Sequence, residues 1–102
     1  MILKKYKVDN SPIAGKGIFA KKDIQKNSNI GLAIIKKKNT GTPDEDYKRK
    51  SLGKYVNHSE KPNLKIKRVG NKIYYITKRN ISKDEELTVN YKNFDFEGKT
   101  KF

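Results

Sequence analysis

Residues 64–77 read Leu-Lys-Ile-Lys-Arg-Val-Gly-Asn-Lys-Ile-Tyr-Tyr-Ile-Thr, and this stretch decides the class of fold. Apolar and polar side chains alternate imperfectly from Leu64 to Val69, as in a strand that buries one face. Gly70-Asn71 supplies a turn, and Lys72 to Thr77 is rich in Ile and Tyr, which favour strands. The stretch therefore predicts a β-hairpin.

Further short strands are predicted on both sides of this hairpin. Ile2 to Val8 alternates, Ile18-Phe19-Ala20 forms an apolar patch, and Glu86 to Tyr91 ends in a tyrosine. Ile30 to Ile35 is nearly all apolar, which predicts a strand covered on both faces. Neither a long amphipathic helix nor an internal repeat is visible. The sequence therefore predicts a mostly-β architecture.

The length of 102 residues limits the chain to a single domain, 1–102. Within it, residues 36–51 read as a surface insert because Gly41 and Pro43 break the pattern, with one short helix starting at Pro43. Residues 97–102 form a polar tail. Since a core of this size is thin, added stability from a homodimer is a reasonable expectation.

The composition excludes several kinds of site. There is no cysteine, which removes disulfides and thiolate zinc sites, and the single His58 stands without nearby carboxylates, so no metal is expected. No apolar run approaches the roughly 20 residues of a membrane span, and the N-terminus has no signal-peptide pattern. We expect an intracellular protein without a membrane partner; nucleus and cytoplasm stay equally open.

The net charge of +14 points to acidic partners, with nucleic acid as the first candidate. Lys, Asn and Ile share A/T-rich codons, however, so genome composition explains the bias equally well. Aromatic residues stand next to lysine at Lys72-Ile73-Tyr74-Tyr75 and fit a nucleic-acid surface. Alternatively, these tyrosines fill the inner face of the hairpin, which is the interpretation we favour.

Three short segments carry candidate chemistry. Gly15-Lys16-Gly17 lets the main chain approach a ligand closely, although no third glycine completes a dinucleotide fingerprint. Asn57-His58 follows an apolar step, and a buried Asn needs hydrogen-bond partners from a ligand or from a turn; the residues alone favour the turn. Tyr91 at a strand end presents its hydroxyl to a cleft, or is an ordinary tyrosine at the edge of the core.

These segments stand in a fixed order, which we give with their neighbours: Ser11-Pro12 before Gly15-Lys16-Gly17-Ile18-Phe19-Ala20, then Asn57-His58-Ser59 before Pro62-Asn63, then Glu85-Glu86-Leu87-Thr88 before Tyr91. In this order and at these separations they resemble the SET domain, over about Val8 to Phe96. The compact length is most similar to the minimal, free-standing SET proteins of viruses.

The resemblance implies a SET-domain fold of several small curved β-sheets with a threaded, pseudoknot-like C-terminal segment. It also implies an enzyme, a protein-lysine methyltransferase that moves a methyl group from S-adenosyl-L-methionine to a lysine side chain of a histone or another protein. The alternative is a catalytically weak or inactive SET-like basic module that binds nucleic acid or chromatin.

The resemblance also implies roles for individual residues. The backbone around Lys16 and Gly17 would hold the methionine end of the cofactor, and Asn57 with His58 would contact its amino-acid and adenine parts. Phe96 would lie against the adenine. By the same resemblance, Tyr91 would be the catalytic tyrosine. Its hydroxyl would orient the substrate amine, which must first lose its proton.

The sequence departs from the family pattern in the wall of the lysine channel. Relatives carry a glutamate and a tyrosine where this chain has Gly31-Leu32-Ala33-Ile34, so Tyr47 or Tyr55 is a candidate replacement. Asn90 replaces the usual Asp, and the small Val89 is compatible with higher methylation states. A histone tail would be repelled by the positive charge unless acidic residues line the groove, for which the candidates are Glu45, Asp46, Glu60, Asp84, Glu85, Glu86, Asp95 and Glu97.

Overall fold

The computed structural model describes residues 4–37 and 47–93. Four expectations lie outside the described residues: the short helix at Pro43, the position of Phe96, the tail at 97–102, and the threading of the C-terminal segment.

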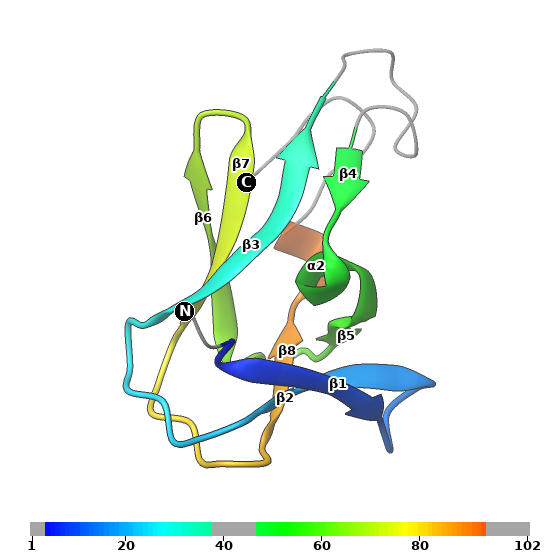
Figure 1. Ribbon diagram of the computed structural model, residues 1–102, viewed down its shortest axis with the longest axis vertical. Coiled ribbons are helices and arrows are strands. Elements are labelled where there is room, and N and C mark those ends of the chain that lie inside the picture. The colour runs from blue at the N-terminus through cyan, green and yellow to red at the C-terminus, as the bar shows by residue number, and fades with distance from the viewer. Residues whose placement is uncertain (1–3, 38–46, 94–102) are drawn as a thin grey trace.

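The first of two sheets is built mainly from the two ends of the chain. Its order is β1 (Tyr6–Asn10), β2 (Lys16–Ala20), β8 (Glu86–Val89) and β5 (Asn57–His58). β2 pairs antiparallel with both β1 and β8, whereas β5 pairs parallel with β8. Figure 1 shows β1 and β2 crossing below the other strands. The last strand of the described residues, β8, therefore lies between β2 and β5.

The second sheet is antiparallel throughout and contains the predicted hairpin. Its order is β4 (Tyr47–Arg49), β3 (Asn29–Lys36), β7 (Lys72–Thr77) and β6 (Leu64–Val69). The β6–β7 hairpin stands at one side of the molecule in Figure 1, with β3 next to it. The hairpin prediction is confirmed, including its turn.

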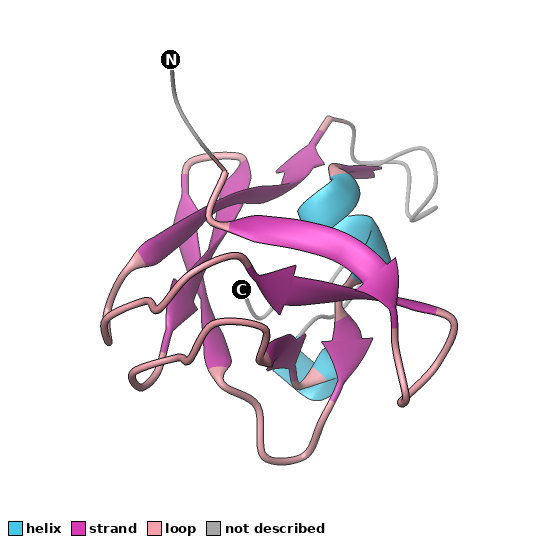
Figure 2. Ribbon diagram, turned by 60° about the horizontal axis from the view of Figure 1, so that its bottom comes forward, coloured by secondary structure: helices cyan, strands magenta, loops and turns pink. Residues whose placement is uncertain are grey.

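Helix is limited to two short turns among the described residues (Figure 2). α2 spans Ser51–Tyr55 and contacts β2 of the first sheet as well as β3 and β4 of the second. The 3₁₀ turn η1 spans Tyr91–Asn93 and follows β8 directly. Because Leu52 of α2 is fully buried, this single turn joins the two sheets through their common core.

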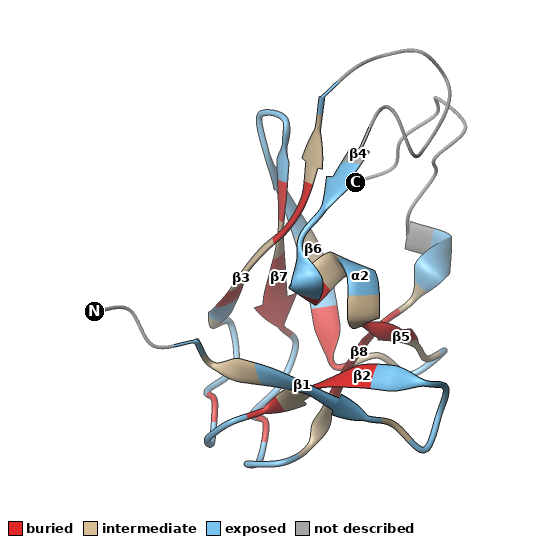
Figure 3. Cartoon of the chain, turned by 45° about the vertical axis from the view of Figure 1, so that its right-hand side comes forward, coloured by how far each residue is buried: buried red, intermediate tan, exposed pale blue. Residues whose placement is uncertain are grey.

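The core lies where the two sheets and α2 meet. Its buried side chains are aliphatic except for one aromatic residue, Tyr75. In Figure 3 the buried segments gather at the middle of the molecule, while β1 and the described part of β4 are exposed. The core is formed by Ile18, Ala20, Ile24, Ile30, Ala33, Ile34, Leu52, Val56, Leu64, Ile73, Tyr75, Ile81, Leu87 and Val89.

The mostly-β class is confirmed, and the boundaries of three predicted strands change. The first described strand runs from Tyr6 to Asn10, and a turn closed by the Ser11 N–H and the Gly15 carbonyl, 2.8 Å apart, connects it to β2. Consequently Lys16 and Gly17 belong to a strand and not to the loop that we expected. The strand expected to reach Tyr91 ends at Val89.

The expectations for residues 30–51 are met in part. Ile30, Ala33 and Ile34 of β3 are buried, but Leu32 and Ile35 keep some exposure, so only one face of this strand is fully covered. The range 36–51, expected as an insert, includes β4, which pairs with the end of β3. This part of the range continues the sheet.

Candidate functional site

Asn57 lies at the junction of three segments. Its side chain is nearly buried, and its Nδ2 donates to acceptors on Lys16 (carbonyl, 3.2 Å) and Glu86 (Oε2, 2.9 Å). Further acceptors are the Ala14 carbonyl and the Ser11 hydroxyl. The structure therefore brings the turn at 11–16, β5 and β8 together around one amide group.

Gly17 makes this packing possible. A Cβ at this position would lie 2.4 Å from Glu86 Oε2, 2.9 Å from Ser11 Cβ and 3.1 Å from Asn57 Nδ2. The Ser11 hydroxyl also donates to the Glu86 carboxylate at 2.8 Å. We expected the glycine to let the main chain approach a ligand; the close neighbours in the structure are side chains of the protein itself.

His58 holds the start of η1. The Tyr91 N–H donates to His58 Nδ1 at 2.9 Å, and the two rings pack with their centroids 5.0 Å apart. Since Nδ1 accepts this bond, the ring proton sits on Nε2. The two residues that the resemblance assigned to the cofactor and to catalysis are therefore in direct contact.

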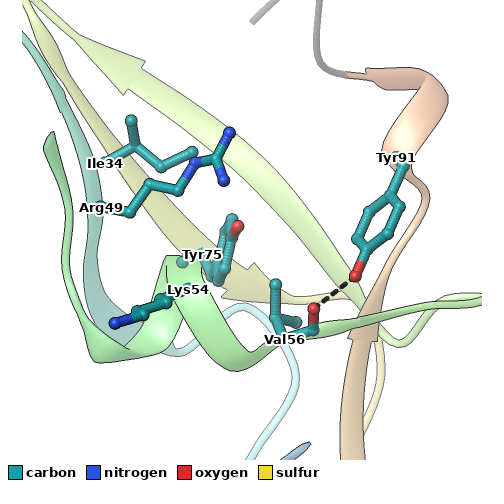
Figure 4. Close-up of a pocket in the computed structure, with 7 residues that line it drawn as sticks. Ile34, Arg49, Lys54, Val56, Tyr75 and Tyr91 are labelled. Atoms are coloured by element: carbon teal, nitrogen blue, oxygen red, sulfur yellow. Dashed lines mark hydrogen bonds between the residues drawn. The ribbon is translucent and has the colours of Figure 1, made fainter. Parts of the chain in front are cut away.

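The Tyr91 hydroxyl forms one wall of a pocket of about 370 Å³. It donates to the Val56 carbonyl at 2.7 Å, which fixes its direction (Figure 4). Tyr91 as a whole residue is 49% exposed, so its hydroxyl is held while much of the residue stays accessible. The pocket is lined by Ile34, Arg49, Gly53, Lys54, Val56, Tyr75 and Tyr91.

Tyr75 is a pocket residue that the sequence reasoning missed. It is 1% exposed, and burial raises the pKa of its hydroxyl well above the ordinary value. Burial also raises the pKa of Tyr91, although the Arg49 charge acts in the opposite direction. Both hydroxyls are therefore protonated at neutral pH. The signal was present in the alternation of β7, because neighbouring residues of a strand face opposite sides and only one of Tyr74 and Tyr75 can face inward.

One of the two expected replacements for the channel wall lies elsewhere. Tyr55 is absent from the pocket lining; it packs against the edge of the core with the Lys54 ammonium 5.5 Å from its ring centre. The Tyr47 side chain lies outside the described residues. In Figure 4 the Arg49 guanidinium points toward the pocket, whereas the Lys54 ammonium points away.

None of the described acidic candidates for a substrate groove lines this pocket. Among the described residues that line it there is no carboxylate. Glu85 pairs with Arg79, whose hydrogen bond lowers the pKa of the carboxyl group, and Glu86 is bonded to Ser11 and Asn57.

Within residues 4–37 and 47–93, no three His, Asp or Glu side chains gather as a metal site. None of the helices in that part of the chain has the length and apolar character to cross a membrane.

The edge strand β5 offers polar backbone groups that could bind a ligand. This strand is at the edge of its sheet, so alternate backbone groups point away from β8 and can bind a ligand. Lys16 and Gly17 lie beside it through the Asn57 amide, and Tyr91 lies beside it through His58. A ligand made of an amino acid joined to a nucleoside needs hydrogen-bonding backbone groups beside an apolar wall, and β5 with the neighbouring pocket offers both. Four of the five residues expected to contact the cofactor are therefore neighbours; the fifth, Phe96, lies outside the described residues.

Comparison with known proteins agrees with this arrangement. No curated protein matches the sequence. A solved structure from Plasmodium falciparum, described as a "putative histone methyltransferase", matches with a TM-score of 0.69 and 25% sequence identity, covering 88% of this chain and 95% of that chain. The model of the SET domain matches residues 33–92, more than half of the sequence. The chain therefore belongs to the SET domain family.

Proposed function

We propose that this chain is a protein-lysine methyltransferase that uses S-adenosyl-L-methionine. One observation carries the proposal: the Tyr91 hydroxyl is fixed by the Val56 carbonyl at the wall of a pocket, next to the edge strand β5. Membership of the SET domain family supports the assignment of methyl transfer.

The pocket has the chemical character that a lysine side chain needs. Its lining is largely apolar, with two protonated tyrosine hydroxyls, and the Arg49 cation points toward it. A lysine ammonium must lose its proton before it attacks a methyl group, and apolar surroundings with a nearby positive charge favour the neutral amine. Tyr91 would then orient the amine, and Val56 would accept a hydrogen bond from it.

The residues beside β5 would hold the cofactor. The backbone of Asn57 and His58 would bind it along the strand edge, and the start of β2 at Lys16 and Gly17 would lie against its amino-acid end. When bound, S-adenosyl-L-methionine supplies an electrophilic methyl group on a sulfonium. Because the Asn57 side chain is already bonded within the protein, its main contribution would be to position Ala14 and the start of β2 at Lys16.

Tyr91→Phe is the direct test. This variant keeps the ring that packs on His58 and loses only the hydroxyl, so the fold should survive. We expect transfer of labelled methyl groups to core histones and to a panel of lysine peptides to fall by about 100-fold, a typical loss for a positioned catalytic group. Tyr74→Phe removes a hydroxyl from the face of β7 opposite to the pocket and should leave the rate of methyl transfer unaltered. Equal rates for wild type and Tyr91→Phe would remove Tyr91 from the mechanism.

Calorimetric titration with the cofactor separates this proposal from its alternative. An active enzyme binds S-adenosyl-L-methionine at one saturable site and transfers the methyl group. A catalytically inactive SET-like module binds without transfer, or does not bind. Lys16→Ala is a weak probe because its backbone makes the contact, so we expect little change in affinity. Asn57→Ala should weaken binding, and a parallel thermal melt shows how much of that loss comes from the fold.

A further inference from the structure

The second sheet has a face that the proposed active site does not use. Side chains of directly paired residues point to the same side of a sheet, so the register sorts the strands into two faces. Tyr75 lines the pocket on the inner side. Tyr74, its neighbour in β7, therefore points to the opposite side, together with its partners Leu32 and Lys67.

Lysines surround Tyr74 on this opposite side. Lys72 stands two residues away in the same strand, and Lys65 stands two residues from the partner of Tyr74 in β6. Lys48 pairs with Ile35, the partner of Lys72. The lysines are exposed and Tyr74 is half-buried. We call Tyr74, Leu32, Lys48, Lys65, Lys67 and Lys72 the outer lysine face.

The spacing of the outer lysine face is compact and its charge has one sign. By sheet geometry, the Cα atoms of Lys65, Lys67 and Lys72 lie roughly 5–8 Å from that of Tyr74. None of the four strands β3, β4, β6 and β7 contains an aspartate or a glutamate. At one end of the face the chain forms a hollow of about 520 Å³, lined by Asn27, Asn29, Lys65, Ile66, Lys67 and Ile76.

We propose that the outer lysine face binds single-stranded nucleic acid. Lysines around an aromatic ring match a strand whose phosphates pair with the ammonium groups while an unpaired base stacks on the ring. A duplex offers no unpaired base for Tyr74, and a second copy of this chain would bring two positively charged faces together. This site is independent of methyl transfer, because it lies on the side of the sheet opposite to Tyr75 and the pocket.

Fluorescence anisotropy with a labelled oligothymidylate of about 12 nucleotides tests the charge requirement. The triple variant K65Q/K67Q/K72Q should bind at least tenfold more weakly than the wild type in about 50 mM salt. Its plot of log affinity against log salt should be shallower by about 2 units, since three phosphate contacts are lost. The matched control K21Q/K22Q/K83Q removes the same charge from exposed positions next to the first sheet and should keep most of the affinity.

Tyr74→Leu tests the stacking requirement. It should weaken binding roughly fivefold or more while leaving the salt slope unchanged, because it removes a ring and no charge. Tyr74→Phe should bind like the wild type. Circular dichroism and a thermal melt on each variant show that the fold is intact.

Three outcomes would overturn the proposal. Equal losses in the two triple variants would show that the net charge alone attracts the oligonucleotide. Competition by polyglutamate as strong as by unlabelled oligonucleotide, with Tyr74→Leu unaffected, would assign the face to acidic polypeptides. Absence of binding at about 100 μM protein in low salt would remove the site altogether.

Discussion

Gly53 in α2 is constrained by the backbone of β3. A Cβ at this position would lie 2.4 Å from the Ala33 carbonyl oxygen and 3.0 Å from Ile34 Cγ1. Because the first of these atoms belongs to the main chain, it cannot move aside cheaply. Helix α2 can therefore approach β3 this closely only because residue 53 has no side chain. Gly53 also lines the pocket.

We therefore expect Gly53→Ala to destabilise the protein. Overpacking of this kind costs about 3 kcal/mol, and the better helix propensity of alanine returns about 1 kcal/mol, which leaves a loss of about 2 kcal/mol in urea denaturation. Lys54→Ala, at the next and exposed position of α2, should change the free energy of unfolding by less than about 0.5 kcal/mol. Similar values for the two variants would contradict the close approach.

Tyr75 makes the stability of the fold depend on alkaline pH. Burial raises the pKa of its hydroxyl in the folded state, so the folded protein keeps a proton that the unfolded chain releases near pH 10. The contribution of the protonated Tyr75 hydroxyl to the free energy of unfolding is complete below about pH 10 and is lost as the pH rises further. We expect the free energy of unfolding to fall by about 1.4 kcal/mol per pH unit above about pH 10.

The matched variant for this pH dependence is Tyr75→Phe. It has no hydroxyl to ionise, so its free energy of unfolding should change less steeply in the same alkaline range, as followed by urea denaturation at a series of pH values. An unchanged slope would show that other groups cause the loss of stability.

At the scale of elements, Asn63 joins the start of β6 to β8. It is 4% exposed; its Oδ1 accepts from the Thr88 N–H at 2.8 Å, and its Nδ2 donates to the Glu86 carbonyl at 2.8 Å. Its own carbonyl accepts from the Lys78 N–H. One side chain therefore satisfies two backbone groups of β8 on the side that faces the hairpin.

Asn63→Ala should cost about 2–4 kcal/mol, because it takes their partner from the buried Thr88 N–H and the partly buried Glu86 carbonyl. Asn71→Ala removes a single exposed hydrogen bond, to the Lys36 carbonyl, and should cost less than about 1 kcal/mol. Thermal melts of the two variants make the comparison. A larger loss for Asn71→Ala would mean that β8 is held mainly by its paired strands.

The elements that the sequence predicts well are those with a local signal. The hairpin at 64–77 follows from alternation and a Gly-Asn turn, both contained in neighbouring residues. The pairing of β5 with β8 joins Asn57 to Thr88 across 31 positions, and two residues have no periodicity from which to predict a strand. Likewise, the contacts of Asn57 with Lys16 and Glu86 depend on three segments that only the fold brings together.

At the scale of the whole molecule, the excess of positive charge acts against compactness. Lys and Arg number 25 and Asp and Glu 11, and the structure shows two ion pairs in its described parts, Lys7 with Asp84 and Arg79 with Glu85. Repulsion among the remaining cations is long-ranged and is screened by salt.

The melting temperature should therefore rise by a few degrees between about 20 and 300 mM sodium chloride, as followed by circular dichroism. K21Q/K22Q/K83Q carries less charge and should show a smaller rise. A melting temperature that falls with added salt would mean that attractive pairs outweigh the repulsion.

The pattern of motifs predicts the family but not the walls of the pocket. Order and spacing of short segments survive in a linear sequence, which is why the resemblance assigns Lys16, Gly17, Asn57 and His58 to the cofactor and Tyr91 to catalysis. Arg49 and Tyr75 reach the pocket from opposite sides of β3, and their inward direction depends on strand register. A one-residue shift would turn them outward, and a pattern of residue types does not fix such a shift.

The position of β8 has a consequence for how the chain is made. β8 lies between β2 and β5, yet it is the last strand in the described sequence. During synthesis from the N-terminus, β2 and β5 therefore leave the ribosome before β8 does. Until β8 follows, each of them has an unpaired edge. Tyr91 follows β8 directly, so no partial chain can assemble the pocket. Such a topology makes folding slow and leaves the nascent chain exposed to aggregation until β8 has been released.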